Sequence, residues 1–210
     1  MALCGIHDSG IRVGDRVLVT GVGAIGLMAV QLARLQGADW VACSDLIAKR
    51  RAIAADLTVD LVIDPGNDDV GLTVKRHTDS HGVDVSIEAS GSYAGLHDAL
   101  RATAYGGTIA SLAYYTGSAD HLHLQGEWHR TQLTLMSSRN VNQPLRSNPR
   151  WDSHRMHQQV IDLLSTGRLR ADGILEPIVP FERSAEAYHE IERNPDNSIK
   201  LAIRYTQPTS

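Results

Sequence analysis

Three glycines near the start of the chain have the spacing of a phosphate-binding turn. The segment VLVTGVGAIG at 17–26 runs from apolar, mostly β-branched residues into Gly21, Gly23 and Gly26. Between a strand and a helix, the first glycine permits a tight turn, the second lets backbone approach a pyrophosphate and the third allows close helix–strand packing. The N-terminus of the helix would then present free N–H groups and a positive dipole end to the phosphates.

An acidic residue follows at the spacing expected for a ribose contact. The next expected strand ends in Asp45, nineteen residues beyond Gly26 (45 − 26). A carboxylate there can accept hydrogen bonds from both ribose hydroxyls, and it would repel a 2′-phosphate by roughly 4 kcal/mol per pair of unit charges. This favours NAD over NADP. Two alternatives stay open: Asp45 is an exposed cap residue, or the basic residues Lys49, Arg50 and Arg51 accommodate a 2′-phosphate.

A second group of chemistry-bearing residues lies in the segment DHLHLQGEWH, which offers His121, His123, Glu127 and His129. On a strand, an H-x-H pair points both imidazoles to one face, where they could share a metal ion. The chain has 10 histidines in 210 residues, so chance clustering is the favoured interpretation and we expect no metal site. The Tyr-x-x-x-Lys pair of short-chain dehydrogenases and the nucleophile elbow G-x-S-x-G are both absent from the sequence.

Length and composition are those of a globular protein. The 210 residues suffice for one large domain or one domain with an appendage, and 42% hydrophobic with 21% charged residues argue against disorder. A net charge of −4 predicts no nucleic-acid partner. Cys4 and Cys43 cannot form a disulfide framework, and the start MALCGIHDSG resembles neither a signal peptide nor a membrane span. We therefore expect a cytoplasmic protein without a membrane partner.

Strand-like and helix-like segments alternate through the first two thirds of the chain. Strands are expected at 16–20, 40–45, 61–64, 83–91, 106–115 and 132–138. Helices are expected at 24–36, 49–57 and 93–104, the first of them ending at Gly37. Strands separated by such helices pair in parallel through right-handed crossovers, which predicts an α/β fold with a doubly wound parallel sheet.

The last third follows a different pattern. After a loop at 140–153, a helix ending near Gly167 is expected to carry on one face Met156, Val160, Leu163 and Leu164. Segment 174–182 contains two prolines that fit only an edge or irregular strand, and 198–205 is a final expected strand. Between them, a helix capped by Ser184 would carry Ala185, Tyr188 and Ile191. These strands do not continue the alternation, so we expect them to belong to another sheet, most of it outside this chain.

Four segments together resemble the zinc-type medium-chain dehydrogenases, which include alcohol, sorbitol and threonine dehydrogenases. These segments are 10–38, 83–91, 106–113 and 167–203. The resemblance implies an NAD(P)-dependent oxidoreductase that transfers a hydride between nicotinamide and a secondary alcohol or ketone. It also implies two parts: an NAD(P)-binding Rossmann domain over residues 1–150, and helices and strands over residues 151–210 that return to a catalytic domain.

The resemblance implies cofactor-binding residues position by position. The pyrophosphate contacts fall on the glycine turn and the start of its helix, at Gly21, Gly23, Ala24 and Ile25, and Gly26 completes the cofactor-binding turn. The contacts to the adenosine ribose fall on Asp45 and Arg50. Ala89 and Ser90 follow the fourth strand and would line the cleft.

Further implied contacts lie toward the nicotinamide. The backbone of Leu112, Ala113 and Tyr114 would hold the nicotinamide amide. Arg139 matches an arginine that lies near substrate and cofactor in polyol-type members of the family. Lys200 matches a basic residue that reaches back to the pyrophosphate, with a surface lysine on an edge strand as the alternative.

One family feature is expected to be absent. The substrate domain of the family comes first and binds the catalytic zinc through a cysteine, a histidine and a third ligand, often glutamate. That third ligand would fall just before MALCGIH, so we expect the zinc ligands to be missing here and assign no catalytic residue. A non-catalytic dinucleotide-binding or oligomerisation module is therefore the alternative function, and a methyltransferase is a weaker one. We also expect self-association, with homo-oligomer pairing through 106–115 or 132–138.

Overall fold

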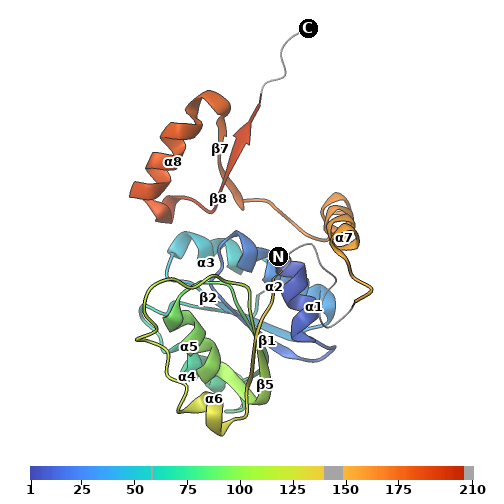
Figure 1. The fold of residues 1–210 in the computed structure, drawn as a ribbon, viewed down its shortest axis with the longest axis vertical. Helices are drawn as coiled ribbons and strands as arrows, with labels where there is room; N and C mark the ends of the chain where they lie inside the picture. The colour runs from blue at the N-terminus through green and yellow to red at the C-terminus, as the bar shows by residue number, and fades with distance from the viewer. Residues whose placement is uncertain (58, 140–148, 206–210) are drawn as a thin grey trace.

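Six parallel strands form one sheet in the computed structural model, which describes residues 1–57, 59–139 and 149–205 (Figure 1). The strands are β1 (Arg16–Thr20), β2 (Trp40–Ser44), β3 (Leu61–Ile63), β4 (Val83–Glu88), β5 (Thr103–Ser111) and β6 (Thr134–Ser137). Their order is β3-β2-β1-β4-β5-β6, and every neighbouring pair is parallel. The predicted α/β doubly wound sheet is confirmed. Its strand order reverses between β1 and β4, where such sheets open a crevice beyond the carboxyl ends of the strands.

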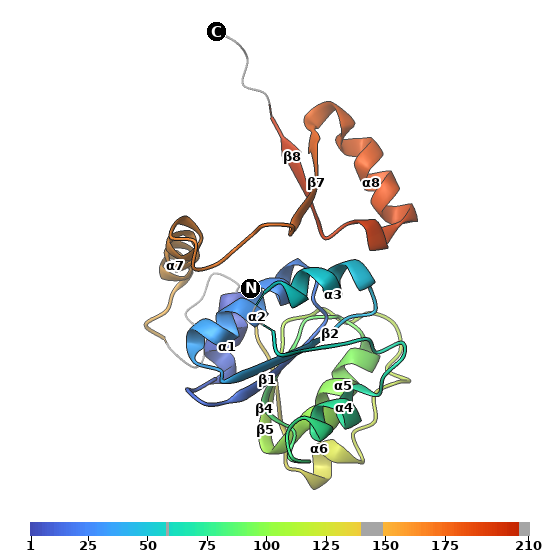
Figure 2. The same ribbon diagram turned by 180° about the vertical axis from the view of Figure 1, so that it is seen from behind.

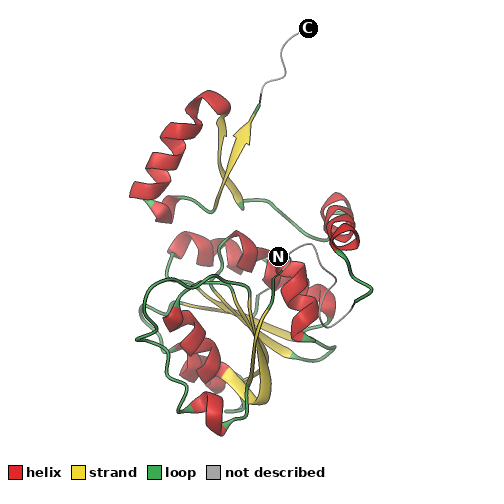
Figure 3. Ribbon diagram, viewed as in Figure 1, coloured by secondary structure: helices red, strands yellow, loops and turns green. Residues whose placement is uncertain are grey.

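Helices cover both faces of this sheet (Figures 1, 2 and 3). One face carries α1 (Ala2–Ser9), α2 (Ala24–Gln36) and α3 (Ala48–Ala55). The opposite face carries α4 (Val70–Arg76) and α5 (Tyr93–Ala102), with the short α6 (Glu127–Arg130) near the amino end of β6. The helices predicted at 24–36, 49–57 and 93–104 correspond to α2, α3 and α5.

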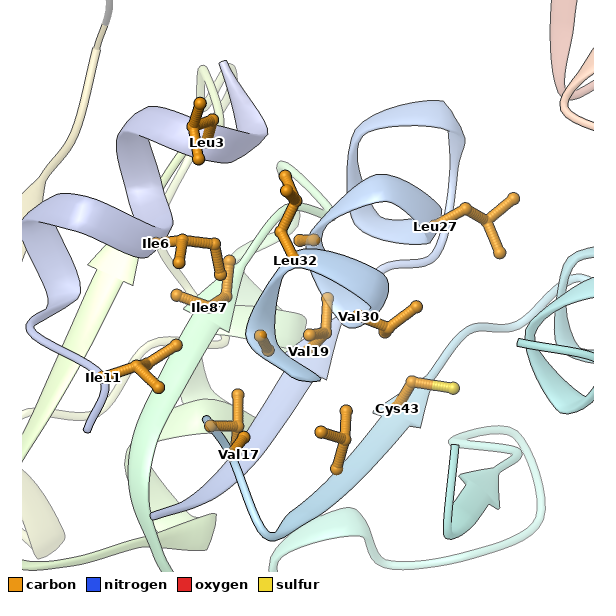
Figure 4. Packing of buried hydrophobic residues seen from close by; sticks show 14 of the residues in the cluster. Leu3, Ile6, Ile11, Val17, Val19, Leu27, Val30, Leu32, Cys43 and Ile87 are labelled. Carbon is orange, nitrogen blue, oxygen red and sulfur yellow. The ribbon is translucent and has the colours of Figure 1, made fainter. Parts of the chain in front are cut away.

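The strand β1 is apolar because both of its faces are covered. Val17 and Val19 belong to the core beneath α2, whereas Leu18 belongs to the core beneath α4. Successive side chains of a strand point to opposite faces, so a strand covered on both sides needs apolar residues throughout. Figure 4 shows Val19 of β1 close to Val30 of α2, with Val17 further along the same strand and Ile87 on the neighbouring strand β4. Each such buried side chain stabilises the fold by about 1.5–3 kcal/mol.

Both cysteines lie inside this core. Cys43 on β2 has no exposed surface, and burial raises the pKa of its thiol to about 12 (Figure 4). Cys4 on α1 is equally buried and unpaired. The prediction of Cys43 as a small apolar filler is consistent with this environment, where the thiol has no thiolate character.

Three short helices were not predicted from the sequence. The helices α1, α4 and α6 have 8, 7 and 4 residues, too few for apolar periodicity to stand out. Tertiary burial of Leu3 and Ile6 holds α1 against the sheet. Asp69 caps α4, because its side chain accepts a hydrogen bond of 2.9 Å from the backbone nitrogen of Leu72. Strand β5 also starts and ends earlier than the predicted 106–115, because Thr103 follows α5 without a loop.

The helix α7 (Ser153–Ser165) packs on the same core as α1 and α2. The loop predicted at 140–153 lies partly outside the described residues. Asp152 caps α7 by accepting a 2.8 Å hydrogen bond from the backbone nitrogen of Arg155. Of the predicted apolar face, Met156 and Leu163 are buried, Val160 packs against the core, and Leu164 is 38% exposed. Leu169 and Ile174, beyond the helix, join the same cluster.

A separate two-stranded sheet follows, formed by β7 (Leu175–Pro180) and β8 (Lys200–Arg204), which pair in parallel. Between them lie η1 (Phe181–Arg183), α8 (Ser184–Arg193) and η2 (Pro195–Asn197). The prediction of Ser184 as the helix cap is wrong, because Ser184 is the first helical residue and Arg183 holds the cap position. Ala185 and Tyr188 are exposed, while Ala187 is buried and Ile191 half-buried. The second sheet predicted for this region is present.

Candidate functional site

The glycine turn between β1 and α2 leaves no room for side chains at two of its three glycines. Gly21 has a φ of 81°, and a Cβ there would lie 2.5 Å from the backbone nitrogen of Ser90. A Cβ on Gly26 would lie 1.9 Å from the carbonyl oxygen of Gly21. Because these contacts involve backbone, a larger residue at Gly21 would force the turn away from the loop after β4, and one at Gly26 would force α2 away from the turn. The positive φ of Gly21 is consistent with its predicted role in a tight turn, and the close approach at Gly26 with its predicted role in helix packing.

The second glycine faces open space. Gly23 is the N-cap of α2, and no side chain caps the helix there. A Cβ on Gly23 would meet only the Arg50 guanidinium, at 3.8 Å. The first N–H groups of a helix lack intrahelical partners, so an uncapped N-terminus facing an open cleft can bind an anion.

Asp45 follows β2 and is oriented by backbone groups on both sides. It is only 7% exposed, and its Oδ2 and Oδ1 accept hydrogen bonds of 2.8 Å from the backbone nitrogens of Val22 and Ile47. The alternative of an exposed cap residue is wrong. Each carboxylate oxygen keeps a lone-pair position for a further donor, so the group can still bind a ligand hydroxyl.

Two of the three basic residues on α3 are engaged within the protein. Arg51 donates to the backbone oxygen of Asp45 at 2.8 Å and pairs with Asp64 at 2.7 Å. Lys49 donates to the backbone oxygen of Asn197 at 2.9 Å and pairs with Glu176 at the same distance. These contacts tie α3 to the sheet and to the C-terminal strands, and leave Arg50 as the α3 cation beside the cleft.

Two buried polar atoms in the cleft have no partner. Among the residues that the structure describes, the Nε of Arg50 and the Oγ1 of Thr20 are both buried without a hydrogen bond, and the Nη1 of Arg50 lies 3.6 Å from Oδ2 of Asp45. Leaving such groups unsatisfied costs about 1–3 kcal/mol each. An incoming polar ligand could satisfy both, so the residues present fit a phosphate- and hydroxyl-bearing group.

These residues line one cavity of about 480 Å³ beyond the carboxyl ends of β1, β2 and β4. Six predicted site residues meet in its wall: Gly21, Gly23, Asp45, Arg50, Ala89 and Ser90. The sequence interpretation missed several other lining residues, among them Leu46, Ile47, Pro65, Gly95, Asp98 and Asp196. Asp98 and Asp196 come from α5 and η2, and no motif linked these elements to the cleft.

A buried carboxylate organises the loops beside this cavity. Glu88, the last residue of β4, is fully buried and accepts hydrogen bonds from the backbone nitrogens of Ser90, at 2.7 Å, and Gly91, at 3.2 Å. The hydroxyls of Ser90 and Tyr115 also donate to it. Tyr115 further contacts the Ser111 hydroxyl at 2.9 Å, and burial together with the neighbouring Glu88 raises its pKa. An acidic residue that ends an apolar strand was the signal for this network.

The remaining predicted contacts lie outside this cavity. Leu112 is buried, Ala113 half-buried and Tyr114 86% exposed, in the loop that follows β5. Arg139 is exposed just after β6. Ala24, Ile25 and Lys200 line a second cavity of about 290 Å³, together with residues of α1 and α7. Lys200 on β8 therefore lies near the start of α2, although far from it in sequence.

The histidine-rich segment does not form the strand on which the possible metal site depends. His121 and His123 lie in a loop, and His123 packs edge-on against His97 with ring centroids 5.2 Å apart. Across residues 1–57, 59–139 and 149–205, no three His, Cys, Asp or Glu side chains are grouped to hold a metal ion. None of the helices in these ranges is long and apolar enough to cross a membrane.

Comparisons with known proteins agree with this architecture. Residues 24–166 match the family model described as "Zinc-binding dehydrogenase". The chain is 38% identical over 205 residues to D-guloside 3-dehydrogenase of Escherichia coli (strain K12), covering 97% of the chain and 59% of the relative. It is 26% identical over 200 residues to L-galactonate-5-dehydrogenase of the same organism, covering 95% of the chain and 55% of the relative.

Solved structures show the same fold. The crystal structure of 2R,3R-butanediol dehydrogenase from Bacillus subtilis matches with a TM-score of 0.80 at 22% identity, covering 99% of this chain and 55% of that one. Alcohol dehydrogenase from Thermus sp. ATN1 matches with a TM-score of 0.79 at 24% identity, covering 98% and 56%. The chain thus spans less than two thirds of the length of these relatives.

Proposed function

The chain belongs to the zinc-binding dehydrogenase family, and on that premise we propose that it is the dinucleotide-binding part of an NAD-dependent oxidoreductase. The observation that carries this proposal is the single cavity in which the uncapped N-terminus of α2, the oriented carboxylate of Asp45 and the unpartnered Nε of Arg50 meet. The N-terminus of α2 suits a pyrophosphate, and the Asp45 carboxylate suits a ribose diol. The Nε of Arg50 can donate to a further polar group of the same ligand.

When bound, the nicotinamide cofactor supplies the hydride chemistry. The residues of this chain bind and orient the dinucleotide. The turn at Gly21–Gly26 and the start of α2 hold the pyrophosphate, Asp45 accepts the ribose hydroxyls, and Arg50 lies beside them. We extend the proposal to the other contacts implied by the family resemblance, which are Ala24, Ile25, Ala89, Ser90, Leu112, Ala113, Tyr114, Arg139 and Lys200.

NAD is the proposed cofactor in preference to NADP. The buried carboxylate of Asp45 would repel a 2′-phosphate, and two of the nearby cations, Lys49 and Arg51, are engaged in ion pairs of 2.9 Å and 2.7 Å. Only Arg50 would remain to receive a 2′-phosphate, and it lies 3.6 Å from Asp45 itself. The basic cluster therefore contributes little to NADP binding.

The substrate class we propose is an alcohol or ketone of the polyol type. D-guloside 3-dehydrogenase and L-galactonate-5-dehydrogenase support this class, because both are named for oxidation of a sugar derivative. The described residues offer no group of three His, Cys, Asp or Glu side chains that could hold zinc. We also propose that residues 1–150 form the dinucleotide-binding domain, that 151–210 return to a catalytic domain, and that the protein is a homo-oligomer.

A fluorescence titration tests the proposal. The full chain is titrated with NADH and with NADPH, while the nicotinamide emission is followed. We expect saturable binding of NADH and weaker binding of NADPH. A flat titration at millimolar NADH would overturn the proposal, and equal affinities would overturn the preference for NAD. The variant Asp68→Asn, which removes a charge from an exposed position outside the cavity, serves as the matched control.

A further inference from the structure

Asp98 is an acidic residue in the wall of the cavity that also contains Asp45 and Arg50. We propose that the Asp98 carboxylate selects adenine as the base, by accepting a hydrogen bond from its exocyclic 6-amino group. This inference rests on the proposed function, because it assigns a specificity-determining residue within the same dinucleotide site.

The position of Asp98 is the first support for this role. Arg50 enters the cavity from α3 on one face of the sheet, and Asp98 enters from α5 on the other (Figures 1 and 2). The wall that they share also contains apolar or small residues: Leu46, Ile47, Pro65, Ala89, Ala94 and Gly95. Such a wall suits the faces of a flat aromatic ring, whose polar edge then meets the acidic group at the border of the cavity.

The unused acceptor capacity of Asp98 is the second support. Within the part of the chain that the structure describes, its carboxylate accepts no hydrogen bond, and burial is the largest influence on its pKa, which rises to about 6. The positive charge of Arg101 lowers the pKa of Asp98 and partly offsets the effect of burial. The Arg101 guanidinium, however, donates to Asp69 at 2.8 Å and lies 3.8 Å from Glu127. A half-buried carboxylate that accepts from no described protein group can accept from a ligand amino group without first giving up a protein donor.

The chemistry of the bases makes this arrangement selective. An ionised carboxylate can only accept hydrogen bonds. Adenine presents an amino group at position 6, whereas hypoxanthine and guanine present a carbonyl oxygen there. Two acceptors would then face each other, and a site built to pair one group rejects the analogue that lacks it. Asp196 lines the same cavity but is exposed, so water can satisfy its carboxylate.

A comparison of two dinucleotides tests the inference. The full chain is titrated with NADH and with reduced nicotinamide hypoxanthine dinucleotide, whose base has a carbonyl oxygen at position 6 and a hydrogen on N1, where adenine has the amino group and an unprotonated N1. We expect the wild-type chain to bind NADH about tenfold or more tightly. In Asp98→Asn, whose amide can accept from an amino group or donate to a carbonyl, the ratio should fall toward one. The Asp68→Asn variant removes an equal charge from an exposed position outside the cavity and should keep the wild-type ratio.

The same titrations separate a failure of the Asp98 role from a failure of the proposed function. Equal affinities of the wild-type chain for the two dinucleotides would overturn the role of Asp98 and leave the proposed function standing. An unchanged preference in Asp98→Asn would also overturn that role. If neither dinucleotide binds the wild-type chain, the proposed function fails, and the inference fails with it. The wild-type ratio needs no variant, so the test does not depend on how well Asp98→Asn folds.

Discussion

The carboxylate of Asp45 accepts a 2.8 Å hydrogen bond from the backbone nitrogen of Val22, which joins the end of β2 to the glycine turn after β1. A second bond of 2.8 Å, from the backbone nitrogen of Ile47, fixes the other oxygen. The group that would bind the ribose is therefore oriented before any ligand arrives. Such preorganisation lowers the entropic cost of binding, because the Asp45 side chain does not have to be ordered when the ligand enters.

The first prediction concerns the charge of Asp45. Asp45→Asn should lower the affinity for NADH and raise the ratio of NADPH to NADH affinity by about tenfold or more, because the repulsion of a 2′-phosphate is lost. Fluorescence titration of both dinucleotides measures the ratio, with Asp68→Asn as control. An unchanged ratio would show that this carboxylate does not determine the choice of cofactor.

The second prediction separates two glycines of the turn. Gly26→Ala should destabilise the fold by about 2 kcal/mol or more, because its Cβ would lie 1.9 Å from the carbonyl oxygen of Gly21. Gly23→Ala should leave stability within about 0.5 kcal/mol and yet weaken dinucleotide binding, because its methyl group enters the open cradle. Urea unfolding and NADH titration measure the two effects. Equal stability losses in both variants would contradict this assignment.

The third prediction concerns the buried network at the end of β4. Glu88→Gln should destabilise the fold by about 1–3 kcal/mol, because its amide cannot accept from all four donors that the carboxylate now satisfies. Tyr115→Phe should cost about 1 kcal/mol, and the double variant less than the sum of the two, because the residues share one network. Tyr114→Phe, at a residue that is 86% exposed, is the control. Additive losses would refute the coupling.

The fourth prediction concerns the pH dependence of stability. Burial raises the pKa of Asp98 to about 6 from an ordinary value of 3.8, so the folded state binds this proton more tightly than the unfolded state. Stability attributable to Asp98 therefore falls as pH rises from about 4 to about 6. Above pH 7, Asp98→Asn should raise the free energy of unfolding by at most roughly 1 kcal/mol after solvent screening, and Tm should rise with it. Below pH 4, the substitution should leave Tm unchanged. An equal gain in Tm above pH 7 and below pH 4 would refute the raised pKa of Asp98.

The sequence predicted the long elements and the centre of the site. Helix α2 has clear helical periodicity, strand β1 is a continuous apolar run, a glycine turn lies between them, and Asp45 follows β2 as the motif requires. The signals that predict these elements are local: the apolar pattern of the strand and the helix, a left-handed Gly37 at the end of α2, and the glycines of the turn.

The rest depends on contacts between distant segments, which periodicity does not encode. The helix α1 forms because Leu3 and Ile6 are buried beneath the sheet. Asp98 reaches the cavity only because α5 packs on the face opposite to α3, and Lys200 approaches the start of α2 only through the folding of residues 166–199. Ser184 has a residue type typical of a cap, but the chain enters α8 through η1, so Arg183 takes that position.

The most direct test of the proposed dinucleotide site is calorimetric titration of the full chain with ADP-ribose, which carries the adenosine and pyrophosphate but no nicotinamide. We expect saturable binding at one site, weakened about tenfold or more in Asp45→Asn and unchanged in Asp68→Asn. Binding of this ligand needs only the cavity formed by the glycine turn, Asp45 and Arg50. Absence of binding at millimolar ADP-ribose, or equal binding by the Asp45→Asn variant, would contradict it.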